Sequence, residues 1–167
     1  MKRFAPFNHS SSRKPGRQNA QGMVEFALVM PILLLVIYGV LEVGRLIFTF
    51  SIVASASREA ARYGSATGLN ISGGILRYRD CTGIRAAAQN VDFLGVIDDP
   101  NITITFDHGP GSGSFSGCPP ASVATGDRIV VLVTTQFAPL AAIVRLSPMT
   151  IRSASARTII GNILIPP

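Results

Sequence analysis

The sequence contains no tryptophan, only two cysteines and two histidines among 167 residues, and only 14% charged residues. Tryptophan is the strongest stacking side chain, so its absence disfavours a surface for carbohydrate or single-stranded nucleic acid. Of the two histidines, His9 falls in a polar N-terminal segment and His108 has no second histidine near it in sequence. Because no constellation of acid, base and nucleophile is present, we expect a protein that is not an enzyme and needs no cofactor, metal or small-molecule substrate.

Acidic residues are missing before Glu25, whereas this segment carries five basic ones: Lys2, Arg3, Arg13, Lys14 and Arg17. The formal net charge of +6 is therefore concentrated in a tail rich in Ser, Arg, Pro and Asn, and we predict a disordered cytoplasmic segment at residues 1–20. Beyond it the arginines alternate with acidic residues. Since no basic stripe with interleaved aromatics follows, we expect no nucleic-acid binding.

A long apolar run follows the tail. Residues 26–41 carry no charge, and after Glu42 and Arg45 the apolar residues resume through Val53. A bilayer core of about 30 Å needs roughly 20 helical residues, and residues 24–46 reach that length. We predict a transmembrane helix with an extramembrane extension at 21–64, kinked or loosened by Pro31. The positive-inside rule places its N-terminus in the cytoplasm and the rest of the chain outside.

A cleaved secretory signal is the rival interpretation of a basic tail and an apolar run. The stretch Ala54–Ala56 resembles a signal peptidase site, but it lies beyond Glu42 and Arg45, too far downstream of the point where such a run should end. The span is also long enough to remain as an anchor. We therefore expect the helix to be retained in the membrane.

The remainder of the chain predicts a small domain at 80–167, joined by a flexible linker at 65–79. Residues from Asp80 to about Phe93 place four apolar residues on one helical face, Ile84, Ala87, Ala88 and Val91, with Asp80 or Thr82 as a cap. Three later stretches, 101–106, 128–135 and 149–157, have strand periodicity, and the first two are separated by a Gly/Ser loop at 109–117. The fold class is α+β, with one helix and an antiparallel sheet of about three to four strands beside the anchor.

Cys81 and Cys118 are the only cysteines, and both fall on the exported, oxidising side of the predicted topology. A disulfide between them is the economical interpretation, worth roughly 2–4 kcal/mol. Two unpaired thiols or a metal site are the alternatives, and a metal site lacks nearby histidines. A weaker possibility is a calcium site formed by four aspartates, although their spacing in sequence fits no EF-hand loop: Asp92, Asp98, Asp99 and Asp107.

Three short motifs in the helix carry a family resemblance. Residues 21–31 read QGMVEFALVMP, residues 39–45 read GVLEVGR, and residues 60–64 read AARYG. This combination closely resembles TadE-like proteins, the minor pseudopilin-type components of tight-adherence (Flp) pilus systems. The resemblance covers roughly the second quarter of the chain. The C-terminal domain resembles these proteins only in its general character.

The resemblance implies cleavage by a prepilin peptidase that leaves a glutamate as the fifth residue of the mature chain. Counting back from Glu25 places the cut between Ala20 and Gln21, although glycine usually precedes it in such proteins. An unpaired carboxylate at the membrane edge is costly, so the new amino group of a neighbouring subunit would neutralise Glu25 and set the stagger between helices. The alternative is that Glu25 lies among lipid headgroups without a specific role.

These observations predict a structural protein of the bacterial inner membrane. We expect a single-pass, pseudopilin-like assembly component of a tight-adherence pilus or related secretion apparatus. Its expected partners are other pilin-type subunits, an inner-membrane assembly platform, a prepilin peptidase and the lipid bilayer. Glu42 and Arg45 share a helical face and can pair at the far interface or with a neighbouring subunit. The alternative function is a membrane-tethered adhesive or ligand-binding domain that acts alone.

Overall fold

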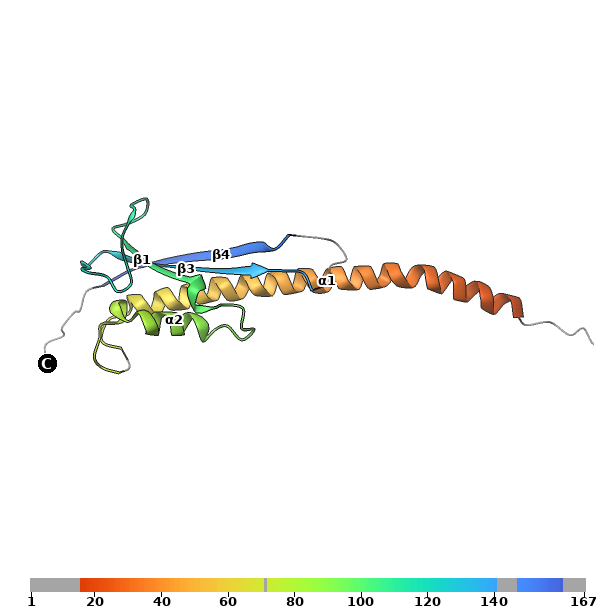
Figure 1. Ribbon diagram of the computed structural model, residues 1–167, viewed down its shortest axis with the longest axis horizontal. Coiled ribbons are helices and arrows are strands. Elements are labelled where there is room, and N and C mark those ends of the chain that lie inside the picture. Colours follow the sequence, from red (N-terminus) through yellow and green to blue (C-terminus); the bar gives the residue numbers. More distant parts are fainter. Residues whose placement is uncertain (1–15, 71, 141–146, 161–167) are drawn as a thin grey trace, which may run out of the picture. The chain divides into compact units, whose positions relative to one another are not determined.

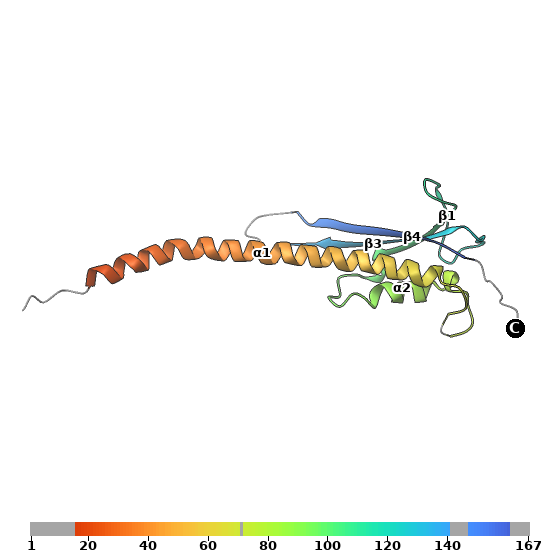
Figure 2. The same cartoon turned by 180° about the vertical axis from the view of Figure 1, so that it is seen from behind.

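The computed structural model describes residues 16–70, 72–140 and 147–160, with side chains from residue 21 onward (Figure 1, Figure 2). The chain divides into two units, Met1–Leu41 and Glu42–Pro167. The element order is one long helix, a short helix and four strands, which confirms the predicted α+β class. The predicted domain boundaries stay predictions, and most of the predicted tail, residues 1–15, lies outside the described residues.

Helix α1 runs from Gly16 to Ser65. It begins five residues before the predicted start at residue 21, because the polar residues that precede Gln21 contain no helix breaker after Gly16. Pro31 lies inside α1 without ending it. The helix ends next to Gly64, where the sequence loses its helix-forming residues and turns to Ser, Thr and Gly.

Helix α2 (Cys81–Gln89) begins where the sequence analysis placed it and is capped by Asp80, whose side chain accepts a hydrogen bond from Gly83 N at 3.0 Å. It is shorter than expected, since the chain leaves the helix at Asn90. The Asp92 carboxylate then accepts a hydrogen bond from Ile97 N at 2.6 Å and fixes a loop in place of the predicted last turn. Short 3₁₀ turns lie at Arg77–Arg79 (η1) and Asp99–Asn101 (η2).

The sheet has four antiparallel strands in the order β2-β1-β3-β4. The strands are β1 (Ile102–Asp107), β2 (Ser114–Gly117), β3 (Arg128–Phe137) and β4 (Met149–Thr158). Three of them match the predicted stretches. Strand β2 lies inside the segment predicted as a Gly/Ser loop, because pairing with β1 orders four residues that have weak strand preference of their own.

The core of the second unit lies between α1 and one face of the sheet (Figure 1). The buried positions of α1 follow a helical stripe: Thr49, Ile52, Val53, Ala56, Ser57, Ala60 and Ala61. Alternate residues of β3 face this stripe, and Ile129, Val131 and Val133 are fully buried. Small residues on the helix allow a close approach, so that the hydroxyls of Ser57 and Ser153 lie 3.1 Å apart.

A disulfide joins Cys81 at the start of α2 to Cys118 just after β2, with the Cα atoms 5.8 Å apart. It is the pairing that the sequence predicted. The bond closes a stretch of 37 residues and links the short helix to the residue that follows the edge strand, β2. The two predicted alternatives for these cysteines, free thiols and a metal site, do not apply.

Candidate functional site

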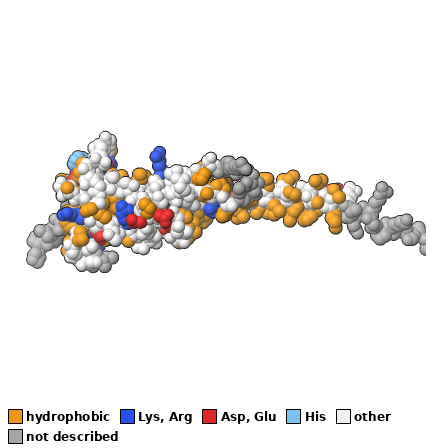
Figure 3. All heavy atoms as spheres, viewed as in Figure 1, with side chains coloured by type: hydrophobic (Ala, Val, Ile, Leu, Met, Phe, Trp, Pro, Cys, Tyr) orange, Lys and Arg blue, Asp and Glu red, His pale blue; other side chains and the backbone are white. Residues whose placement is uncertain are grey.

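The apolar segment of α1 in the first unit exposes its side chains. From Gln21 to Leu41, every residue except Tyr38 and Gly39 is exposed, including most of the large apolar ones. Hydrophobic side chains cover this part of the helix in Figure 3. Helix α1 is long and apolar enough to cross a membrane. Because a soluble helix buries its apolar residues, this segment needs lipid or another helix as its surroundings.

Glu25 is exposed near the start of the apolar segment, and its Oε1 accepts a hydrogen bond from Gln21 Nε2 at 3.2 Å. The two residues lie four apart, one helical turn. Ala20, the predicted residue before the cleavage point, lies in α1. The cleavage between Ala20 and Gln21 and the registry role of Glu25 stay predictions.

Glu42 and Arg45 lie where the second unit begins, and both contact the end of the sheet. Arg45 Nη2 lies 3.2 Å from Glu42 Oε2 and also donates to the carbonyl of Ala138. Glu42 Oε1 accepts a hydrogen bond from Leu140 N at 2.9 Å, and the Arg45 guanidinium lies 4.4 Å from the centre of the Phe137 ring. The pair therefore holds Ala138 and Leu140, which follow β3, against α1. These contacts join residues that are 93 and 98 positions apart in sequence.

These contacts could not be predicted from the sequence. Spacing predicts that Glu42 and Arg45 share a helical face, and the structure shows them 3.2 Å apart. Nothing local to residues 42–45 indicates that β3 ends beside them, since that depends on the topology of the whole sheet. Pairing of Glu42 or Arg45 with a neighbouring subunit stays a prediction.

A second polar cluster lies at the opposite end of the sheet. Arg128 donates to both oxygens of Asp107 at 2.7 Å, and Asp127 Oδ1 lies 2.8 Å from His108 Nδ1. The His108 ring stacks on Phe115 with a centroid distance of 4.3 Å. The sequence shows only that His108 has no second histidine near it, whereas in the structure its contacts tie the loop between β1 and β2 to the start of β3.

These contacts lower the pKa values of two aspartates. Hydrogen bonds from Arg128 are the main cause for Asp107, and the hydrogen bond with His108 is the main cause for Asp127, helped by Ala124 N. A carboxylate with a lowered pKa in the folded state stabilises the fold above its unfolded pKa of about 3.9, and this contribution disappears as the pH falls through the folded value.

We therefore expect the second unit to lose stability as the pH falls from about 5 to below about 3, since the unfolded chain binds protons at both aspartates at about pH 3.9 whereas the folded chain binds them only at lower pH. The measurement is amide hydrogen exchange of β3 at a series of pH values, corrected for intrinsic exchange. Asp107→Asn serves as the matched variant, because it lacks one of the two titrating groups. It should be less stable near neutral pH and should show a shallower acid loss; an acid loss as steep as that of the unmodified chain would contradict the assignment.

The aspartates considered for calcium do not gather around one point. Asp92 accepts from Ile97 N, Asp99 pairs with Arg85 at 3.6 Å, and Asp107 pairs with Arg128. Within the residues that the structure describes, no group of three or more His, Cys, Asp or Glu side chains is placed to hold a metal ion. The aspartates instead fix loops and strand ends.

Comparison with known proteins bears on the α1 segment. The model of the TadE-like protein family matches residues 20–62, which is the part of α1 that holds Glu25, the exposed apolar run and the Glu42–Arg45 pair. None of the curated proteins matches the chain, and no solved structure matches it. Over residues 20–62, this chain is therefore similar to TadE-like proteins.

Proposed function

We propose that this chain is a membrane-anchored, pseudopilin-like structural component that assembles with a tight-adherence (Flp-type) pilus or a related secretion apparatus. The observation that carries the proposal is that the TadE-like match covers the stretch in which α1 exposes its apolar side chains. A helix that presents such a surface has two suitable environments, lipid and the apolar helices of other subunits. Such a role requires no catalysis.

The proposed topology places the N-terminus in the cytoplasm and the second unit outside the inner membrane. The five basic residues of the tail support this orientation. The Cys81–Cys118 disulfide supports it independently, because structural disulfides persist in oxidising compartments and are rare in the cytosol.

Glu25 is the residue that we propose sets the stagger between neighbouring helices. It is exposed at the edge of the apolar run, and its described contact, with Gln21, is a weak one between two exposed side chains. Cleavage between Ala20 and Gln21 would create an α-amino group four residues away from this carboxylate. In a staggered array, the amino group of one subunit would neutralise Glu25 of the next, which lowers the cost of placing a carboxylate near hydrocarbon.

The test begins with the N-terminal residue of protein extracted from membranes, with and without the prepilin peptidase of the same cells. We expect a start at Gln21 that depends on the peptidase. Glu25→Gln should then abolish or strongly reduce surface pili while the protein still reaches the membrane, because the amide cannot neutralise an amino group. Glu59→Gln is the matched control on the same helix, where the glutamate pairs with Arg62 within the chain.

An intact N-terminus in both strains would mean that Ala20 prevents cleavage and that the helix is a permanent anchor. Wild-type pilus levels in Glu25→Gln would remove the registry role. Both results together would leave the alternative function, a tethered domain that acts alone, as the better account.

A further inference from the structure

One end of the second unit carries a group of exposed apolar side chains from four separate segments. Helix α1 contributes Ile47, Phe48 and Phe50, which are 57 to 62% exposed. Three more come from the loop after α2, the residues after β3 and the start of β4: Phe93, Leu140 and Met149 at 73%, 79% and 48% exposed. We call these six residues the apolar belt. Single exposed apolar residues are common on protein surfaces, whereas a group of this size marks an interaction surface.

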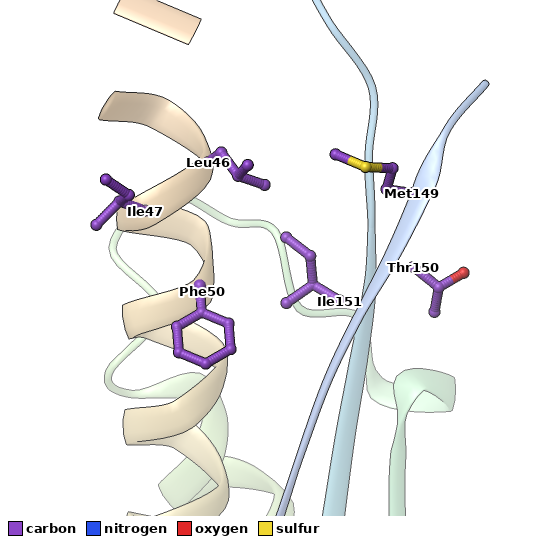
Figure 4. Close-up of a pocket in the computed structure, with 6 residues that line it drawn as sticks. All are labelled: Leu46, Ile47, Phe50, Met149, Thr150 and Ile151. Carbon is purple, nitrogen blue, oxygen red and sulfur yellow. The ribbon is translucent and has the colours of Figure 1, made fainter. Parts of the chain in front are cut away.

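The belt residues lie along one stretch of α1, between Glu42 and Ser51. Met149 lines a groove of about 410 Å³ together with Leu46, Ile47 and Phe50, and Figure 4 shows Leu46 and Ile151 on facing sides of it. Phe93 lines a second recess, of about 290 Å³, with Phe48 and Ser51. Leu140 is held there because its amide donates to Glu42. Contacts to one stretch of α1 therefore bring together segments that are far apart in sequence.

The position of the belt along α1 matches the outer edge of a membrane. Glu25 and Arg45 are 20 residues apart, which is about 30 Å in a helix and equals the thickness of the hydrocarbon core. With these two charges at the two edges, the helical rise from Arg45 to Phe50 is about 7.5 Å, close to the depth of one interfacial layer. Ile47, Phe48 and Phe50 then fall among the lipid headgroups and the first carbons of the acyl chains.

We propose that the apolar belt rests in the outer interfacial layer of the membrane that α1 crosses and contacts its phospholipids. The second unit would thus be docked on the bilayer by Phe93, Leu140 and Met149 in addition to its helix. Lipid is the occupant that the structure favours, because exposed apolar residues of α1, Val40, Leu41 and Val43, lie between its apolar run and the belt. The charges nearby, Glu42 and Arg45, pair with each other.

The opposite end of the sheet has the character of a surface turned toward water. By the strand register, Met149 pairs with Phe137 at one end of β3, whereas Arg128 at the other end pairs with Asp107. Asp107, His108, Asp127 and Arg128 form the polar cluster at that far end. A polar end and an apolar end on one sheet fix the direction in which the second unit meets the membrane.

The absence of tryptophan makes the proposal directly measurable, because an introduced tryptophan is the only one in the chain and can be excited separately from the three tyrosines. The full-length chain carries Phe93→Trp in the belt, Phe115→Trp at the far end, or Leu34→Trp in the apolar run. Each variant is reconstituted into vesicles of palmitoyl-oleoyl phosphatidylcholine and phosphatidylglycerol, with or without phosphatidylcholine brominated near the headgroup or deep in the chain. Migration on a non-reducing gel verifies the Cys81–Cys118 bond in each variant.

We expect shallow bromines to reduce the emission of Phe93→Trp by about twofold or more and deep bromines to reduce it less, as for a residue in the interface. Phe115→Trp should keep its full emission. The proposal rests on membrane anchoring by α1, which Leu34→Trp reports separately through quenching by deep bromines. Quenching of Leu34→Trp without quenching of Phe93→Trp would overturn the belt proposal and leave the anchor intact. Absence of quenching in both would overturn both.

A second copy of the chain is the competing occupant. If subunits cover the belt, Phe93→Trp will be shielded from acrylamide in the water phase and will also be insensitive to bromine at either depth. That combination would overturn the lipid contact in favour of an interface between subunits. Sensitivity to shallow bromine when the protein is diluted in excess lipid supports the proposal.

Discussion

Removing the Cys81–Cys118 disulfide lowers the free energy of unfolding of the second unit by about 3–4 kcal/mol, as expected for a cross-link that closes a loop of this length. The bond spans 37 residues that include α2, β1 and β2. Without it, the unfolded chain gains the freedom to separate the two ends of this stretch. The measurement is amide hydrogen exchange of β3 in the detergent-extracted chain, which reports opening of the sheet.

The comparison uses the Cys81→Ser, Cys118→Ser double variant and the reduced, unmodified chain. Reduction changes no packing beyond the sulfur atoms, so the two should lose the same protection within error. A loss confined to the double variant would mean that the serines disturb their surroundings and that the cross-link itself contributes little. Unchanged protection in both would contradict the prediction.

The elements that the sequence predicted are those with a strong local pattern. The uncharged run of residues 26–41 can hardly form anything but a helix, and the alternation at 102–106 and in β4 places apolar residues on one side of a strand. The start of α2 was also predictable, because Asp80 is a good cap. The disulfide followed from the presence of only two cysteines together with the predicted export of the domain.

The features that escaped prediction depend on contacts between distant residues. Strand β2 forms because β1 lies beside it, although its own residues, Ser114–Gly117, favour a loop. The contact of Glu42 with Leu140 joins residues 98 positions apart, and no local pattern encodes it. The apolar belt could not be predicted for the same reason. Phe93 and Met149 lie beside the same stretch of α1 only because of the order of the strands and the lengths of the loops.

The second large effect is expected from a single methyl group, in Gly83→Ala. Alanine in place of glycine usually stabilises a helix by about 0.5–1 kcal/mol. Here an added Cβ would lie 2.3 Å from Asp80 Oδ2 and 2.5 Å from the Tyr63 hydroxyl, closer than atoms approach without a shift. We expect the free energy of unfolding to fall by about 2–3 kcal/mol instead, since overpacking is combined with loss of hydrogen bonds.

The cost is large because Asp80 joins several parts of the fold. Its carboxylate accepts from Gly83 N, from Tyr63 at 2.8 Å and from Asn70 at 3.2 Å. Burial alone would raise the pKa of Asp80, but these three hydrogen bonds outweigh it and hold the pKa below its usual range. A displaced carboxylate would release the start of α2, the end of α1 and the connection between them.

Gly44→Ala is the matched control, because this glycine also lies in a helix and an added Cβ there meets no atom within 4 Å. It should leave the protection of β3 unchanged or slightly raised. Repeating Gly83→Ala in an Asp80→Ala background completes a double-mutant cycle, in which the methyl group should cost less once the carboxylate is gone. An equal cost in both backgrounds would show that the conflict lies elsewhere, and a gain in stability from Gly83→Ala alone would contradict the close approach at α2.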